Sequence, residues 1–129
     1  MKKKLPRTIF LPVLGFLFLC ALATIVELRF KIMQRGYDNF VLDNRNHYLP
    51  CRDLPARIEV ERMMAQHQDA IQQIQQVAPG AIGIEIDSLN CEGKADVLIW
   101  YGTHQQRVEI EKIIGGDTFF GIPYRLQNR

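Results

Sequence analysis

The sequence predicts an α+β fold, with an N-terminal transmembrane helix followed by a small α-β-β-α-β domain. This domain is expected to form a three-stranded mixed sheet with two helices on one face. Three observations lead to this prediction. Residues 9–26 form an unbroken run of 18 uncharged positions. Apolar residues then recur every three or four positions over a long stretch, and later segments alternate or are apolar throughout.

The chain is expected to have four parts. They are a basic N-terminal flank at residues 1–7, a transmembrane signal anchor at 8–28, a tether at 29–50 and the α/β domain at 51–129. A helix needs about 20 apolar residues to cross a hydrocarbon core of about 30 Å, and the uncharged run approaches that length. The domain has about 80 residues, which is enough for one small core but not for two.

The apolar run has a second interpretation as a secretory signal peptide. Its small-residue pattern Ala21-Leu22-Ala23 allows cleavage before Thr24. The anchor is favoured because the run is longer than the usual apolar region of a signal peptide, about 7 to 15 residues, and continues past the cleavage position. Both interpretations take the domain out of the cytoplasm.

Charge differs between the two ends of the chain. Residues 1–46 contain eight Lys and Arg against three Asp and Glu, whereas residues 47–129 contain eight against eleven. The basic flank favours a cytoplasmic N-terminus, so we expect a single-pass membrane protein with its domain on the extracytoplasmic side, or a secreted or periplasmic one if cleaved. The acidic domain lacks the basic surface that nucleic acids require, so no nucleic-acid partner is expected.

The first element of the domain is predicted to be one helix of about six turns starting at Pro55. Proline suits the first helical position, and Pro79-Gly80 provides a stop. One side of this helix is an apolar stripe with steps of three and four residues. The stripe consists of Val60, Met64, His67, Ile71, Ile74 and Ala78.

Two strands are predicted to follow. Residues 81–87 alternate isoleucines with small or acidic residues, as in a half-buried strand. Residues 95–101 are apolar on both faces after their first positions, which indicates the centre of the sheet. Residues 88–94 form a turn, so the two strands are expected to pair antiparallel.

A second helix is predicted to begin at Thr103, which with Gln106 fits a capping box, and to end at Gly115-Gly116. Its buried side is expected to contain Val108, Ile110, Ile113 and Ile114. As a crossover connection, this helix would place the second and third strands parallel.

The third strand is predicted at residues 119–126. Its position is expected to be at a sheet edge because Pro123 cannot donate a ladder hydrogen bond. The residues expected on one face are Phe120, Ile122, Tyr124 and Leu126.

The sheet face without helices is the predicted partner surface. Leu98, Trp100 and Phe119 are expected to project there, and an apolar face of that size usually marks a protein-binding surface. In the alternative, the apolar island at residues 40–42 of the tether covers this face.

The cysteines predict one disulfide. Cys20 lies in the apolar run, which leaves Cys51 and Cys91 as a pair in an oxidising compartment. Their bond would close a loop of about 40 residues and contribute about 3 to 4 kcal/mol. A redox-active dithiol is not favoured because no C-x-x-C pair is present.

The segment Trp100 to Arg107 is the candidate ligand site, because it joins the end of a central strand to a helix N-terminus, where backbone amides attract anions. Thr103, His104 and Arg107 are its candidate ligand-binding residues. No metal is predicted, since the three histidines and two cysteines lack standard ligand spacing. No cofactor is predicted, since the glycines form neither a dinucleotide-binding nor a Walker motif. His47 and Cys51 could pair as base and nucleophile only through an accidental loop geometry.

Two functions remain open. The favoured hypothesis is a membrane-anchored, non-enzymatic accessory or interaction module that presents a small extracytoplasmic domain to a protein partner. The alternative is a small-ligand-binding or enzymatic domain that uses the Trp100 to Arg107 strand-helix junction. In that alternative, His104 is the candidate acid or base.

Overall fold

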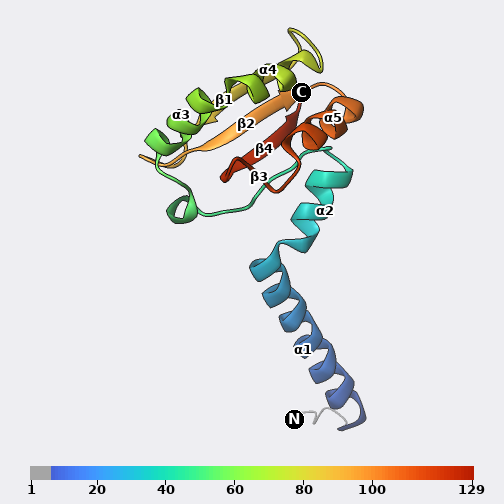
Figure 1. Ribbon diagram of the computed structural model, residues 1–129. Helices are drawn as coiled ribbons and strands as arrows, with labels where there is room; N and C mark the ends of the chain where they lie inside the picture. Colours follow the sequence, from blue (N-terminus) through green and yellow to red (C-terminus); the bar gives the residue numbers. More distant parts are fainter. Residues whose placement is uncertain (1–6) are drawn as a thin grey trace. The chain divides into compact units, whose positions relative to one another are not determined.

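The computed structural model of this chain describes the backbone of residues 7–129 and the side chains of residues 11–129. Apart from Arg7, the predicted basic flank at residues 1–7 lies outside this part. The described part has an α+β fold with five α-helices and a four-stranded mixed sheet (Figure 1). The chain forms two compact units, Met1–Gly36 and Tyr37–Arg129.

The first unit is dominated by a single apolar helix, α1, at Arg7–Phe30. Within it, Leu11–Phe30 is long and apolar enough to cross a membrane, and none of its most apolar window is buried. The prediction of an N-terminal apolar helix is confirmed, and this helix has the properties of either a membrane span or a signal sequence. Pro12 lies inside it, near its start, which membrane helices tolerate.

The predicted tether at residues 29–50 contains regular structure of its own. Lys31 has a φ of 49° and separates α1 from a second helix, α2, at Ile32–Phe40. The segment then runs as an irregular chain to a short 3₁₀ turn, η1, at Cys51–Asp53. The compact unit that contains the predicted domain begins at Tyr37, so it also includes the second half of the predicted tether.

The sheet of the domain has the order β1-β2-β4-β3 (Figure 1). β1 and β2 are antiparallel, with Glu85 opposite Leu98, and β2 and β4 are parallel, with Leu98 opposite Arg125. Both pairings confirm the predicted hairpin and crossover. The elements of the domain are α3 at Arg57–Gln66, α4 at Gln68–Gln76, β1 at Gly83–Asp87, β2 at Asp96–Tyr101, α5 at His104–Ile114, β3 at Thr118–Phe119 and β4 at Ile122–Asn128.

The hydrophobic core lies between one sheet face and the helices α3, α4 and α5. Val97, Ile99 and Tyr101 supply the β2 side of this core, since alternate residues of a strand share a face. In β4, Tyr124 and Leu126 lie opposite Val97 and Ile99 and are buried with them. The helices contribute Val60, Met63, Ala70, Ile71, Ile74 and Ile110.

The predicted single first helix is wrong, because the structure has two helices, α3 and α4, that meet at His67. This residue leaves the helical conformation, with φ −119° and ψ 41°. Its ring stacks on Phe120, with ring centroids 3.6 Å apart. The break therefore coincides with a tertiary contact, and the apolar stripe, which continues through the break, gave no sign of it. The start is also later than Pro55, because the Pro55 carbonyl accepts a hydrogen bond from the N–H of Ala95 and the N–H of Arg57 donates to the carbonyl of Gly93, which keeps Ala56 extended opposite Lys94.

The end of the sheet differs from the prediction in three ways. Phe120 and Gly121 have φ values of 51° and 86°, which produces a two-residue hairpin turn between β3 and β4 and adds a fourth strand. As a consequence Phe119 enters the core, while Phe120 is exposed. Pro123 does not mark an edge strand, since β4 lies between β2 and β3.

The predicted apolar partner face needs correction. Phe119 belongs to the core, and Leu98 is buried. Trp100 is half-buried, because its ring lies directly over Gly83 on one side and under the guanidinium of Arg129, 3.9 Å from the ring centroid, on the other. The indole nitrogen is buried and has no hydrogen-bond partner among the described residues.

The predicted disulfide is confirmed between Cys51 and Cys91, with a Cα–Cα distance of 5.3 Å. It connects the end of the tether to the turn between β1 and β2. Because Cys51 is bonded, it cannot act as the nucleophile of a pair with His47, and that alternative is wrong. The remaining cysteine, Cys20, is free and exposed within α1.

Candidate functional site

The strand-helix junction is built as a helix cap. Thr103 is the N-cap of α5, and its hydroxyl accepts a hydrogen bond from the backbone N–H of Gln106 at 3.3 Å. The side chain of Gln106 accepts in return from the backbone N–H of Gly102 at 2.8 Å. This variant of the capping box satisfies two backbone donors at the start of the helix. The predicted beginning of α5 is confirmed, and so is its end at Gly115, which is left-handed with φ 73°.

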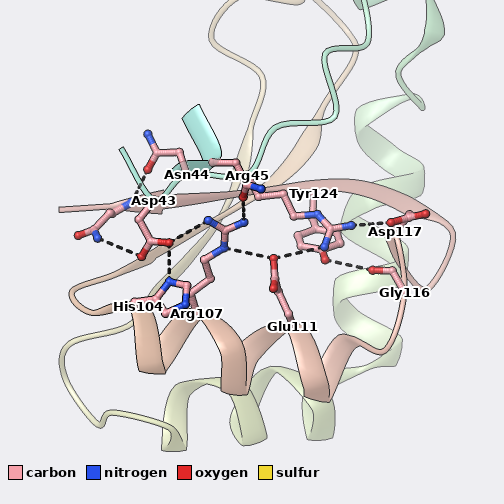
Figure 2. Close-up of polar contacts among 11 residues, drawn as sticks. Asp43, Asn44, Arg45, His104, Arg107, Glu111, Gly116, Asp117 and Tyr124 are labelled. Atoms are coloured by element: carbon pink, nitrogen blue, oxygen red, sulfur yellow. Dashed lines mark hydrogen bonds and ion pairs between the residues drawn. The ribbon is translucent and has the colours of Figure 1, made fainter. Parts of the chain in front are cut away.

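Arg107 is buried at the centre of an ion-pair network between α5 and the tether (Figure 2). Its Nη1 donates to Asp43 Oδ1 at 2.9 Å and its Nε donates to Glu111 Oε1 at 3.2 Å. Its Nη2 donates to the side-chain oxygen of Asn39. Burial acts to lower the pKa of Arg107, but its acidic partners outweigh burial and raise that pKa above its ordinary value.

Asp43 is shared by two side chains, Arg107 and His104. Besides Arg107, it accepts a hydrogen bond from Nδ1 of His104 at 2.8 Å (Figure 2). Burial acts to raise the pKa of Asp43, and the hydrogen bonds from His104 and Arg107 outweigh burial and hold the pKa below its ordinary value. The carboxylate is therefore the ionised centre of the network at neutral pH. The imidazole of His104 is itself largely exposed.

Arg45 extends the network towards the end of α5. Its guanidinium pairs with Glu111 at 3.3 Å and with Asp117 at 2.6 Å, and lies 5.0 Å from the centroid of the Tyr124 ring. Its backbone forms two hydrogen bonds with Leu126, at 2.8 and 2.9 Å. Tether residues 39–45 are thus bound to both α5 and β4, and we call this set of contacts the Arg107 network.

A second cluster lies on the sheet face that carries Leu98. Arg125 makes a bidentate pair with Asp96, at 2.6 and 3.0 Å, and also contacts Asp87. The tether adds His47, whose Nε2 lies 2.6 Å from Asp96 Oδ2. Since the backbone N–H of Leu49 donates to Nδ1 of His47 at 2.9 Å, the proton of this imidazole is on Nε2 and is donated to Asp96. We call these contacts the Arg125 cluster.

Asp96 is the buried anion of the Arg125 cluster. Burial acts to raise its pKa, but the hydrogen bonds from His47 and Arg125 outweigh burial and keep the pKa below its ordinary value. The hydrogen bond to Asp96 is also the main reason that the pKa of Arg125 is raised. Asp96 is therefore ionised at neutral pH, with the guanidinium of Arg125 as its cationic partner.

The three candidate ligand-binding residues lie close together in the chain but have different surroundings. The hydroxyl of Thr103 caps the helix, and the guanidinium of Arg107 is bound by Asp43, Glu111 and Asn39. His104 alone presents its ring to solvent. A carboxylate on Nδ1 orients an imidazole for proton transfer, so the ligand site stays a prediction centred on His104.

Two further groups at the site bear on its chemistry. The hydroxyl of Tyr101 is buried, and burial together with the negative charge of Asp43 raises its pKa to about 12, so this group is neutral at physiological pH. Among the residues that the structure describes, no group of three or more His, Cys, Asp or Glu side chains could hold a metal ion.

Comparison of this chain with models of protein families, with characterised proteins and with solved structures finds no match.

Sequence reasoning missed the partners of Arg107, although part of the signal was present. Arg107 lies three residues before Ile110 and is therefore on the buried side of α5, whereas Val108, predicted there, is exposed. Glu111 follows at i+4, the spacing of a helical ion pair. The contributions of Asp43 and Arg45 come from more than 60 residues away and have no local signal.

Proposed function

We propose that this chain is a single-pass, membrane-anchored accessory module whose disulfide-bonded domain lies on the extracytoplasmic side and binds a protein partner. The observation that carries the proposal is the exposed apolar helix Leu11–Phe30 ahead of a domain with a disulfide. Such a helix is stable only in lipid or against other apolar helices. A disulfide persists in compartments outside the cytosol.

The polar groups of the domain support an interaction role. The charged side chains that could act on a substrate, Arg107 and Arg125 among them, are used to bind the tether and to join strands. Their function in the fold is to hold the segment after α1 against the sheet and α5. That arrangement suits a protein whose domain is displayed from an anchor.

The partner surface that we favour is the sheet face around Trp100. Its aromatic ring is stacked beneath Arg129, and Trp and Arg are the residues most often found at interaction hot spots. Glu85 and Gln127 are exposed and lie on the same face, since they pair with Leu98 and Trp100 across the sheet. A photoreactive probe can therefore be placed at Glu85 or Gln127 without replacing Trp100.

The anchor is tested by washing membranes that contain the full-length chain at alkaline pH. The anchor interpretation expects the intact chain in the membrane fraction. A released species that begins at Thr24 would contradict anchoring and establish the signal peptide.

The partner surface is tested by photocrosslinking in native membranes. A photoreactive residue at Glu85 or Gln127 is expected to give one discrete crosslinked protein, whereas the same residue at Gln73, on the exposed side of α4, serves as the matched control. Equal crosslinking from all three positions, or none from the two sheet positions, would exclude this face as the partner surface.

A further inference from the structure

An apolar strip is exposed at the start of the domain unit. The segment after α1 carries a tyrosine and, three residues later, three consecutive large apolar residues, and none of these four side chains is buried. Their exposed fractions are 56% for Tyr37, 87% for Phe40, 64% for Val41 and 43% for Leu42. We call these four residues the juxtamembrane strip. Consecutive exposed apolar residues of this kind are unfavourable in water unless a binding partner covers them.

The strip and the polar side of α2 point in different directions. Met33, Tyr37 and Phe40 are spaced by four and three residues, so they share one side of the helix. Asp38 and Asn39 lie on the other side, where they bind Tyr48 and Arg107 of the domain. The polar side of this segment is therefore occupied by the domain, while the apolar side is exposed.

Chain continuity keeps the strip close to the end of the candidate span. Phe40 follows the end of the span, Phe30, by only ten residues, and Lys31 breaks the helix between them, so α2 is not a straight continuation of the span. The interfacial zone of a bilayer extends about 5 to 8 Å beyond the hydrocarbon core on each side, and interfacial helices lie in that zone with their apolar side inward. Tyrosine is enriched there.

The charges around the strip favour a lipid surface. Arg29 lies in the last turn of the span, Lys31 and Arg35 lie between the span and the strip, and basic residues at the end of a span are attracted to anionic headgroups where the leaflet contains them. A protein surface would have to provide both an apolar groove and negative charge at the same height above the membrane. A bilayer containing anionic lipid provides both.

We propose that the juxtamembrane strip binds the lipid surface on the domain side of the membrane. This inference rests on the anchoring proposed above and adds a second membrane contact to it. Because the same segment is bound to the domain through Asn39 and Asp43, the strip would hold the domain at the headgroup layer. The domain would then have a restricted orientation over the bilayer.

The test uses spin labels on the full-length chain in vesicles of phosphatidylcholine and phosphatidylglycerol. Cys20 is replaced (Cys20→Ser), and a nitroxide is attached through Val41→Cys or, as the matched control, through Leu89→Cys. Leu89 is an exposed leucine of the same domain in the turn between β1 and β2, with an exposed fraction of 91%. Collision rates with oxygen, which partitions into lipid, and with a water-soluble nickel chelate report the depth of each label.

The ratio of the oxygen rate to the nickel rate is expected to be several-fold higher at position 41 than at position 89. The ratio at position 41 should decrease towards the value at position 89 in the double variant Phe40→Ser and Leu42→Ser. In vesicles of phosphatidylcholine alone, the ratio at position 41 should lie between these two values. Equal ratios at the two positions in a chain that survives an alkaline wash would overturn lipid binding and leave the anchor intact. Dipolar broadening of the label at position 41 would assign the strip to a second copy of the chain instead. A chain lost from the vesicles in the wash would overturn both proposals.

Discussion

Arg125 and Arg107 each neutralise acidic side chains, but they obtain their partners from different parts of the chain. The partners of Arg125 within the sheet, Asp87 and Asp96, face each other across the β1–β2 hairpin. Arg107 instead relies on Asp43, which is 64 residues earlier in the chain. The first arrangement follows from strand register, whereas the second forms only when the tether has reached its place.

The two sites also differ in burial. The Asp96 side chain is 4% exposed, whereas that of Asp43 is 20% exposed. Water can therefore compensate a lost partner at Asp43 better than at Asp96. This difference indicates that the Arg125 cluster stabilises the sheet, while the Arg107 network mainly determines where the tether lies.

The largest loss of stability is expected where the tether is covalently attached to the sheet hairpin, at the disulfide. Replacing both cysteines, Cys51→Ser and Cys91→Ser, should reduce the free energy of unfolding by about 4 kcal/mol, as a closed loop of this length implies. Urea unfolding of the full chain in detergent, followed by the fluorescence of its one tryptophan, measures the loss. A Cys20→Ser variant is the control and should unfold like the original chain.

A smaller but substantial loss is expected from Arg125→Met. The variant leaves Asp96 buried without its bidentate partner, which should cost about 3 kcal/mol in the same urea experiment. The matched control is Arg57→Met, because the pair of Arg57 with Glu61 is exposed and should contribute less than about 1 kcal/mol. Similar losses in both variants would mean that burial does not distinguish these ion pairs.

In the Arg107 network, the variant Arg107→Met should reduce the free energy of unfolding by about 2 kcal/mol. The loss is smaller than for Arg125→Met because the two acidic partners of Arg107 remain partly hydrated. We expect this variant to loosen the tether locally. Trypsin should cleave after Arg45 faster in this variant than in Arg125→Met or in the exposed control Glu109→Gln. Unchanged cleavage at Arg45 would show that the Arg107 network does not hold the tether.

The smallest loss of stability is expected when the wild-type chain is brought to acidic pH. Asp96 and Asp43 have lowered pKa values in the folded state, because the hydrogen bonds that each carboxylate accepts from one histidine and one arginine outweigh burial. Their contribution to stability is complete above the unfolded value of about 3.9 and is lost as the pH falls through the folded value. Urea midpoints should therefore decrease below about pH 4, and Asp43→Asn should show a weaker decrease. A pH dependence that is identical in this variant would contradict the role of Asp43.

The first two strands and the second helix of the predicted domain could be predicted because their signals are local. Alternation in residues 81–87 and the cap at Thr103 identify an element without any knowledge of its neighbours. The even number of cysteines outside α1 likewise predicted the Cys51–Cys91 bond. These predictions needed only the order of residues.

The remaining errors have a common physical cause, which is contact between distant segments. The helix break at His67 coincides with stacking on Phe120, and Phe120 is available for it only because it forms a turn with Gly121. The same holds for the candidate site. Arg107 was recognised as a candidate anion-binding residue, but its actual partners in the tether could not be inferred from a segment that showed no periodicity.

The position of β4 has a consequence for biosynthesis. β4 pairs with β2 on one side and with β3 and Arg45 on the other, so it completes the sheet, yet it follows all the other described elements in the chain. Ribosomes add about 5 to 20 residues per second, so the earlier elements wait for seconds with the β2 edge unpaired. An unpaired strand edge invites aggregation. A chain that stalled before β4 would therefore yield an aggregation-prone intermediate rather than a smaller folded domain.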